Sequence, residues 1–350
     1  MEARHDLHVR IEGRVGRITL TRPQALNAVN QLIVDMMTEA LLAWETDGSI
    51  NLVLVDAEGE KAFSAGGDLA FVYRHGKSGD IATPNRFWRD EYRLNALISR
   101  YSKPYVAVMD GIVMGGGVGI SAHGSHRIVT DNSMIAMPEC AVGLVTDVGG
   151  SWLLRRAPGH MGEYLGLTGT RMKGEDAIHA GFADLYVHRR RLQDLKAALV
   201  EAGDIAALDH FVEAPPPSTL AAQQQDVDRI FSAPTLPDIL DRLRADSSEW
   251  ALKSLDAIEK GSPLSALMIF SAVRRATSME TALRNEYRFV SRVLEHGDFL
   301  EGIRAIVIDK DRNPVWRHQG IAAVPPELVT LMQSEAEGGD LNLTNWEDRP

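Results

Sequence analysis

The stretch over residues 104–150 limits most strongly what this chain can fold into, because a glycine cluster (GGGVG, residues 115–119) lies between apolar runs. Residues 105–109 (YVAVM) are typical of a buried strand, and residues 118–124 are predicted to continue as a helix. Backbone N–H groups at a helix start lack acceptors and lie at the positive end of the helix dipole. Since glycine permits close approach, this loop can hold a developing oxyanion, and we interpret it as part of an active site.

Composition narrows the class of protein. The 350 residues, 45% of them apolar, suffice for one large domain with an appendage. A net charge of −11 argues against general binding to nucleic acid or to a membrane surface, and no apolar run has membrane-spanning length. Cys140 is the single cysteine, so no internal disulfide is expected. With no charged and then apolar leader over residues 1–12, we expect a cytoplasmic protein.

The N-terminal part has the order strand, strand, helix, strand. Residues 7–23 alternate as in a hairpin, residues 27–44 repeat apolar side chains at helical spacing, and residues 51–56 are typical of a buried strand. A second glycine turn follows in KAFSAGGDL (61–69), leading into a polar segment through residue 83 that we interpret as mobile. An isolated Gly-Gly is usually an ordinary turn, but the other glycine cluster favours a second loop of N–H donors.

Beyond residue 150 the pattern predicts helices over 152–167 and 173–180 and a strand over 182–187. Three prolines within residues 214–218 indicate a linker, because they favour an extended spacer. We therefore predict a catalytic core over residues 1–213 and a mostly helical C-terminal region over residues 214–350. The helical region is interpreted as an appendage that covers the core or as the interface of a homo-oligomer.

Four motifs in order carry a family resemblance: KAFSAGGD (61–68), RDEYRLN (89–95), DGIVMGGGVGIS (110–121) and AMPECAVGLVTDVGG (136–150). Together they resemble the crotonase (enoyl-CoA hydratase/isomerase) superfamily, and within it most closely the 3-hydroxyisobutyryl-CoA hydrolases. The resemblance implies an α/β fold in which repeated strand-strand-helix units wind into a spiral, followed by a helical C-terminal region. Fold by itself does not settle the chemistry.

The resemblance also implies which backbone groups bind substrate. The N–H groups of Gly67 and Gly116 match the family's oxyanion hole, which holds the thioester carbonyl oxygen as its charge grows. Their neighbours Gly66, Asp68 and Gly115 are expected to line the substrate.

Three acidic residues at matching positions are implied to act on or line the substrate. Glu139 matches the superfamily's principal acid/base residue, and Asp147 matches the second carboxylate of the hydrolase branch. Paired carboxylates can divide acid and base work when their environments separate their pKa values. Glu91 is expected at the substrate end. An ordinary glutamate or aspartate is more often a solvated surface residue, so the motif positions carry this assignment.

The implied reaction is hydrolysis of a short branched 3-hydroxyacyl-CoA thioester, such as 3-hydroxyisobutyryl-CoA in valine catabolism. Glu139 would attack the carbonyl or activate water, while Asp147 would hold the substrate hydroxyl, orient water or protonate the leaving thiolate. Coenzyme A is part of the substrate, so no separate cofactor is expected. Its phosphates call for basic side chains, for which Arg22 and Lys61 are candidates.

The chain departs from the family pattern at two places. Gly119 stands where superfamily hydratases carry their second glutamate, which weakens the alternative of an enoyl-CoA hydratase or isomerase that uses Glu139 alone. Val145 and Thr146 replace the Phe-Pro pair common in the hydrolase branch, so the shape of the acyl pocket, and with it the acyl group, stays open. A non-catalytic module that has kept the fold is a further alternative, disfavoured by retention of both carboxylates and both glycine loops.

Other kinds of site find little support. Residues 117–122 satisfy the G-x-G-x-x-A pattern of dinucleotide binding, with Glu139 downstream as a ribose-binding acid, but this pattern explains neither the first glycine loop nor Asp147. Ser121 lies in a near miss of the serine-hydrolase elbow. The histidines lack ligand spacing, so we predict no metal.

Overall fold

The computed structural model describes residues 6–344, which form two compact units. The first unit comprises residues 6–67, 94–136 and 171–221, and the second comprises residues 68–93, 137–170 and 222–344. The predicted division of the chain at residue 213 stays a prediction. Among residues 6–344, none of the helices combines the length and the apolar character needed to cross a bilayer.

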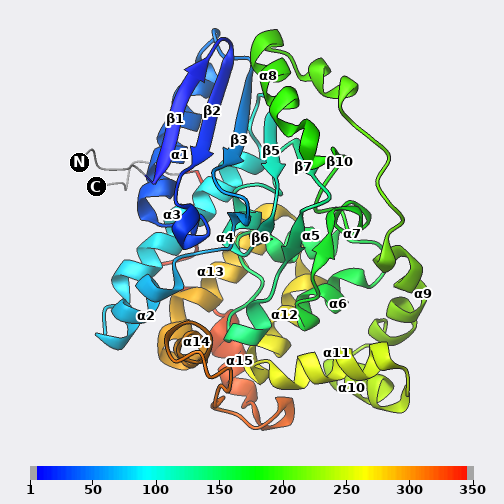
Figure 1. The fold of residues 1–350 in the computed structure, drawn as a ribbon. Helices are drawn as coiled ribbons and strands as arrows, with labels where there is room; N and C mark the ends of the chain where they lie inside the picture. The colour runs from blue at the N-terminus through cyan, green and yellow to red at the C-terminus, as the bar shows by residue number, and fades with distance from the viewer. Residues whose placement is uncertain (1–5, 345–350) are drawn as a thin grey trace. The chain divides into compact units, whose positions relative to one another are not determined.

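Ten strands belong to the first unit: β1 (Leu7–Glu12), β2 (Val15–Leu20), β3 (Leu52–Ala57), β4 (Ala62–Ser64), β5 (Tyr105–Met109), β6 (Ile112–Met114), β7 (His126–Val129), β8 (Met134–Ala136), β9 (Met172–Lys173) and β10 (Leu185–Tyr186). They build a six-stranded sheet, β1-β2-β3-β5-β7-β10, and a four-stranded sheet, β4-β6-β8-β9. The successive pairs β3/β4, β5/β6 and β7/β8 each give one strand to each sheet (Figure 1). This repeated winding confirms the predicted spiral.

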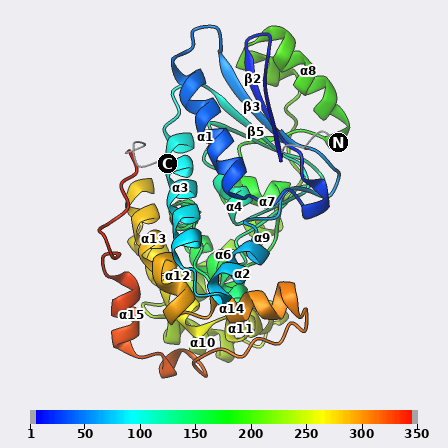
Figure 2. The same cartoon turned by 90° about the vertical axis from the view of Figure 1, so that its left-hand side faces the viewer.

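The helices of the first unit are α1 (Gln31–Thr46), α4 (Gly116–Gly119), α7 (Gly174–His179) and α8 (Leu192–Ala202), with short turns η1 (Pro23–Ala25), η3 (Arg189–Arg191) and η4 (Ile205–His210). Helices α1 and α8 cover opposite faces of the larger sheet (Figure 2). Leu195 and Leu199 of α8 pack with Leu54 and Val106 of the strands. Burial of these apolar side chains is the main stabilising term of the unit.

The second unit is helical. Its elements are α2 (Leu69–Lys77), η2 (Glu139–Val142), α5 (Gly150–Arg155), α6 (Met161–Thr168), α10 (Leu236–Ala245), α11 (Glu249–Lys260), α12 (Pro263–Arg275), α13 (Met279–His296), α14 (Phe299–Ile303), η5 (Arg304–Ile308), η6 (Ile321–Ala323) and α15 (Pro326–Gln333). Helix α12 contacts α5 and α6, and α13 contacts α5 and α15. Helices α3 (Ala82–Ser99) and α9 (Thr219–Phe231) have residues in both units. The predicted helical C-terminal region is confirmed.

Two local predictions were wrong. The helix expected over residues 118–124 is the short α4, which ends at Gly119. The helix expected over 152–167 is two helices, α5 and α6, because Pro158 and Gly159 interrupt it and Gly159 takes a φ of 54°. The segment that we interpreted as mobile is largely helical, and Asp68 caps α2 by accepting a hydrogen bond from the Phe71 N–H at 3.0 Å, while the mobility of the segment stays a prediction.

Candidate active site

The two glycine loops lie against each other in the first unit. Strands β4 and β6 are parallel neighbours, so the loops that follow them leave the same edge of the sheet. Gly66, with a φ of 114°, lies so close to the second loop that an added Cβ would be 3.3 Å from the Met114 carbonyl oxygen. A Cβ on Gly117 would be only 2.3 Å from the Ser64 carbonyl oxygen. Glycine is therefore required where the two backbones meet.

The predicted donor groups sit on this pair of loops. Gly116 is the first residue of α4, so its N–H has no acceptor within the helix. Gly115 precedes it with a φ of 47°, a conformation that favours glycine. Gly67 forms an isolated parallel β-bridge with Val29, and the Val29 N–H donates a hydrogen bond to the Gly66 carbonyl oxygen at 2.8 Å. The assignment of the Gly67 and Gly116 N–H groups to a substrate carbonyl stays a prediction.

The three predicted acids are all buried in the second unit. Glu91 comes from α3, Glu139 begins η2, and Asp147 lies in the turn before α5; their exposed fractions are 2%, 5% and 5%. One carboxylate oxygen of Glu91 and one of Glu139 are buried with no hydrogen-bond partner among the described residues. Buried carboxylates without partners are costly for folding, which makes a functional role the better explanation of their presence.

The three acids influence one another electrostatically. Burial raises the pKa of Glu139 well above its usual range, and the charge of Asp147 raises it further. Burial and then the charge of Asp147 likewise raise the pKa of Glu91. Burial raises the pKa of Asp147 to about 7, although the hydrogen bond from Tyr92 lowers it. Among these three acids, Asp147 is the one that accepts a hydrogen bond from the Tyr92 side chain and has a pKa near neutrality.

Two further residues belong to this cluster and were missed by sequence reasoning. The Tyr92 hydroxyl donates a hydrogen bond to Asp147 Oδ2 at 2.8 Å. Glu286 of α13 accepts hydrogen bonds from the backbone N–H groups of Gly149 and Ser151, just beyond Asp147. Tyr92 stands in the motif over residues 89–95, whereas Glu286 lies outside the four motifs, and only the fold brings the two residues to Asp147.

Of the remaining predicted residues, Asp68 and Arg22 have structural contacts of their own. Asp68 is the N-cap of α2, as described above. Arg22 forms an ion pair with Asp6 at 3.4 Å and donates to the Ala28 carbonyl oxygen at 2.9 Å. Lys61 is exposed at the start of the first glycine loop. Of the two basic candidates, Lys61 is thus the more accessible to a phosphate.

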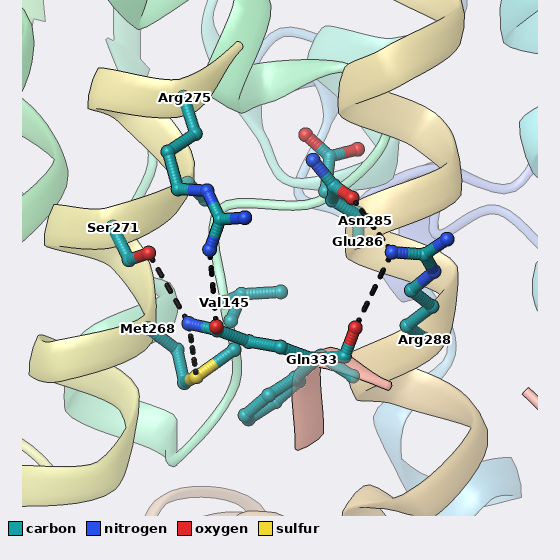
Figure 3. Close-up of a pocket in the computed structure, with 10 residues that line it drawn as sticks. Val145, Met268, Ser271, Arg275, Asn285, Glu286, Arg288 and Gln333 are labelled. Carbon is teal, nitrogen blue, oxygen red and sulfur yellow. Dashed lines mark hydrogen bonds between the residues drawn. The ribbon is translucent and has the colours of Figure 1, made fainter. Parts of the chain in front are cut away.

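A small cavity of about 30 Å³ lies between α12, α13 and α15 (Figure 3). Gln333 closes part of it by donating to the Ser271 hydroxyl at 3.2 Å and accepting from Arg275 at 3.1 Å. Glu286 and Val145 also line it. Since this volume corresponds to about one water molecule, the cavity is too small for a branched acyl group.

No group of three or more histidine, cysteine, aspartate or glutamate side chains in residues 6–344 is arranged to hold a metal ion. The dinucleotide pattern over residues 117–122 also lacks its structural context. Helix α4 ends at Gly119, whereas pyrophosphate binding in that fold relies on a longer helix after the glycines.

Comparison with known proteins decides the family. The family model described as "Enoyl-CoA hydratase/isomerase" matches residues 15–332. The chain belongs to the enoyl-CoA hydratase/isomerase family. A Danio rerio relative named "3-hydroxyisobutyryl-CoA hydrolase, mitochondrial" is 37% identical over 95% of this chain and 90% of its own. An Arabidopsis thaliana relative named "3-hydroxyisobutyryl-CoA hydrolase 1" is 36% identical over 97% of this chain and 94% of its own.

Two solved structures of this enoyl-CoA hydratase/isomerase family have nearly the same fold. An enoyl-CoA hydratase from Rhodobacter sphaeroides superposes with a TM-score of 0.92 at 44% identity, covering 96% of this chain and 99% of that one. A carnitinyl-CoA dehydratase from Mycobacterium thermoresistibile gives a TM-score of 0.93 at 42% identity, covering 97% and 99%. The α/β fold with a helical C-terminal region is therefore shared over at least 96% of the chain.

The expectation of a cytoplasmic location was wrong. Relatives from Danio rerio, Xenopus tropicalis, Gallus gallus and Rattus norvegicus are named mitochondrial, which contradicts it. Net charge, cysteine usage and hydropathy describe proteins of any aqueous compartment, so they could not separate the cytoplasm from the inside of a mitochondrion.

Proposed function

We propose that this chain is a thioester hydrolase that releases coenzyme A from a short branched 3-hydroxyacyl-CoA, with 3-hydroxyisobutyryl-CoA of valine catabolism as its substrate. The observation that carries the proposal is the buried pair Glu139 and Asp147, whose pKa values are both raised by burial. Such a pair supplies one carboxyl group to act as base or nucleophile and another to act as acid. The choice of 3-hydroxyisobutyryl as the acyl group rests on the names of the relatives.

In the proposed reaction the N–H groups of Gly67 and Gly116 polarise the thioester carbonyl as negative charge develops on its oxygen. Ionised Glu139 either attacks the carbonyl carbon, giving a mixed anhydride that water hydrolyses after the thiolate has left, or takes a proton from a water molecule that attacks the carbonyl carbon directly. The C–S bond then breaks, and the departing thiolate accepts a proton, for which Asp147 is a suitable donor because its pKa is about 7. Water and thioester are consumed, and a carboxylic acid and a thiol are formed.

Binding groups complete the proposal. Glu91, Gly66, Asp68 and Gly115 would line the acyl and thioester end, and the exposed Lys61 would meet a phosphate of coenzyme A, with Arg22 as second candidate. The C-terminal helices would cover the core or join copies of the chain. Sedimentation of the purified protein would test self-association directly.

Hydration of an enoyl-CoA is the second candidate, because both solved structures carry hydratase or dehydratase titles. Gly119 opposes it, since it occupies the position where superfamily hydratases carry their second glutamate. The test is a panel of acyl-CoA and enoyl-CoA thioesters, in which thiol release and loss of enoyl absorbance are scored separately. Thiol release from 3-hydroxyisobutyryl-CoA without hydration of crotonyl-CoA supports the proposal, whereas hydration without thiol release supports the second candidate.

A further inference from the structure

Glu286 is a buried acid that has no role in the proposed reaction. Its side chain is 1% exposed, and it lies on α13, more than 130 residues from the Asp147 turn in sequence. One oxygen accepts from the Gly149 N–H at 2.7 Å, and the other accepts from the N–H and the hydroxyl of Ser151 at 3.1 and 2.5 Å. The carboxylate thus satisfies amides at the start of α5 that have no acceptor within the helix.

The turn that Glu286 holds is conformationally strained. Val148 is a buried β-branched residue with a φ of 54°, and Gly149 follows with a φ of 78°. A non-glycine residue in this region is strained and persists only where surrounding contacts impose it. Within the turn the Gly150 N–H donates to the Asp147 carbonyl oxygen at 2.7 Å. Glu286 binds the far side of the turn, while Tyr92 binds the Asp147 side chain.

Glu286 also places a charge among other acids. Its pKa is raised to about 8, chiefly by burial and also by the charge of Asp147, against the hydrogen bonds from Ser151 and Gly149. In turn the charge of Glu286 raises the pKa of Glu139. The titratable and charged groups around Glu286 are Asp147, Glu139, Tyr92 of α3, and Arg275 and Arg288, which line the same cavity (Figure 3).

We propose that Glu286 is a positioning residue for Asp147: it fixes the strained turn that carries this carboxylate and sets the charge environment of Glu139. The inference rests on the proposed function, which gives Asp147 and Glu139 their parts in thioester cleavage. A neutral amide could not replace the carboxylate, because its NH₂ group would face an N–H donor of the turn.

The test compares Glu286→Gln with Glu163→Gln. Glu163 of α6 is a buried glutamate of the same unit, 4% exposed, and its carboxylate pairs with Arg274 and His160 rather than with the Asp147 turn. Both variants are checked by circular dichroism and thermal unfolding. The pH dependence of kcat/KM for thiol release from 3-hydroxyisobutyryl-CoA is then measured for each, together with Glu286→Asp, which keeps the charge at a shorter reach.

We expect Glu286→Gln to lower kcat by about 10- to 100-fold, since small misplacement of a reacting group has effects of this size. Glu139 must be ionised to act, so activity rises with pH through its pKa. Loss of a neighbouring negative charge lowers that pKa, so the rising limb of the pH–rate profile moves to lower pH.

Glu286→Asp should keep the wild-type midpoint while losing rate, and Glu163→Gln should change unfolding temperature alone. A folded Glu286→Gln with unchanged rate and midpoint overturns the inference, as does a loss of rate with no shift of midpoint.

Failure of the proposed function is distinguishable from failure of this inference. If the wild type releases no thiol, the titration of ¹³C-labelled glutamate carboxyl groups by NMR tests the effect of Glu286 without any turnover. A lower midpoint for Glu139 in Glu286→Gln supports the inference, and an unchanged midpoint overturns it.

Discussion

Tyr92 and Asp147 lie 55 residues apart in sequence, yet the tyrosine hydroxyl donates to the aspartate carboxylate at 2.8 Å in a fully buried position. A hydrogen bond to an ionised carboxylate favours its charged form, so this contact works against the burial that raises the pKa of Asp147. The balance of the two effects leaves the pKa of Asp147 at about 7, where a carboxyl group can both hold and release a proton near neutral pH.

Tyr92→Phe should therefore raise the pKa of Asp147 above about 7. It should also lower kcat/KM at pH 7 by about 10- to 100-fold, because Asp147 loses the hydrogen bond that holds its side chain, and this is the range for a hydrogen bond to a charged group. The pKa is measured by NMR on ¹³C-labelled aspartate. Tyr287→Phe is the matched control, because the Tyr287 ring packs edge-on against Tyr92, with their centroids 6.3 Å apart. An unchanged pKa in Tyr92→Phe would show that the hydrogen bond does not set the charge state of Asp147.

Asp147→Asn should make the protein more stable at high pH. Because the pKa rises from 3.8 in the unfolded chain to about 7 in the folded one, stability is lost as pH increases between these values and stays lower above them. The difference corresponds to about 4 kcal/mol, which the amide removes. Calorimetry should show a higher Tm for Asp147→Asn at pH 8 and no gain at pH 3. The exposed Asp194→Asn should show no such gain, and an equal gain at both pH values would argue against a titration effect.

The same variant separates two roles for Asp147. If its carboxylate binds the substrate hydroxyl, Asp147→Asn should reduce kcat/KM for 3-hydroxyisobutyryl-CoA far more than for isobutyryl-CoA, since sites built for a hydroxyl discriminate strongly. Equal losses on the two thioesters would make Asp147 a general catalyst of C–S cleavage. Unchanged kcat/KM on both would remove Asp147 from the site.

Gly117→Ala should destabilise the paired glycine loops. The new Cβ would lie 2.3 Å from the Ser64 carbonyl oxygen, so the backbone must shift at a cost of about 1–3 kcal/mol. We expect a lower Tm and loss of thiol release, because the neighbouring N–H group of Gly116 would move. Gly48→Ala is the control, since a Cβ there meets no atom within 4 Å. If both variants retain wild-type Tm and rate, the loops do not need their close approach.

Local patterns predicted much of the fold. The hairpin β1–β2, the helix α1 and the strand β5 were all expected from apolar spacing, because each buries one face or both faces of a regular element. The break between α5 and α6 was overlooked because Pro158 and Gly159 stand in a segment that otherwise has helical spacing. A single proline and glycine outweigh that pattern by their backbone restrictions.

The site was predictable only in part. Motif positions gave Glu139 and Asp147 because their sequence neighbours are distinctive, whereas Tyr92 and Glu286 act through contacts made across 55 and 137 residues of chain. No local spacing reports such contacts. The strain at Val148 was likewise invisible, because a valine in sequence does not indicate a positive φ.

The most direct test of the account is thiol release from 3-hydroxyisobutyryl-CoA by the wild type and by Glu139→Gln, with binding of the thioester measured in parallel. The amide keeps the shape of the side chain but removes its charge and basicity, so its effect should fall on kcat and leave binding intact. We predict ready release by the wild type and a loss of at least about 100-fold in kcat for the folded variant, as expected for a general base. Release by Glu139→Gln at the wild-type rate would contradict the account.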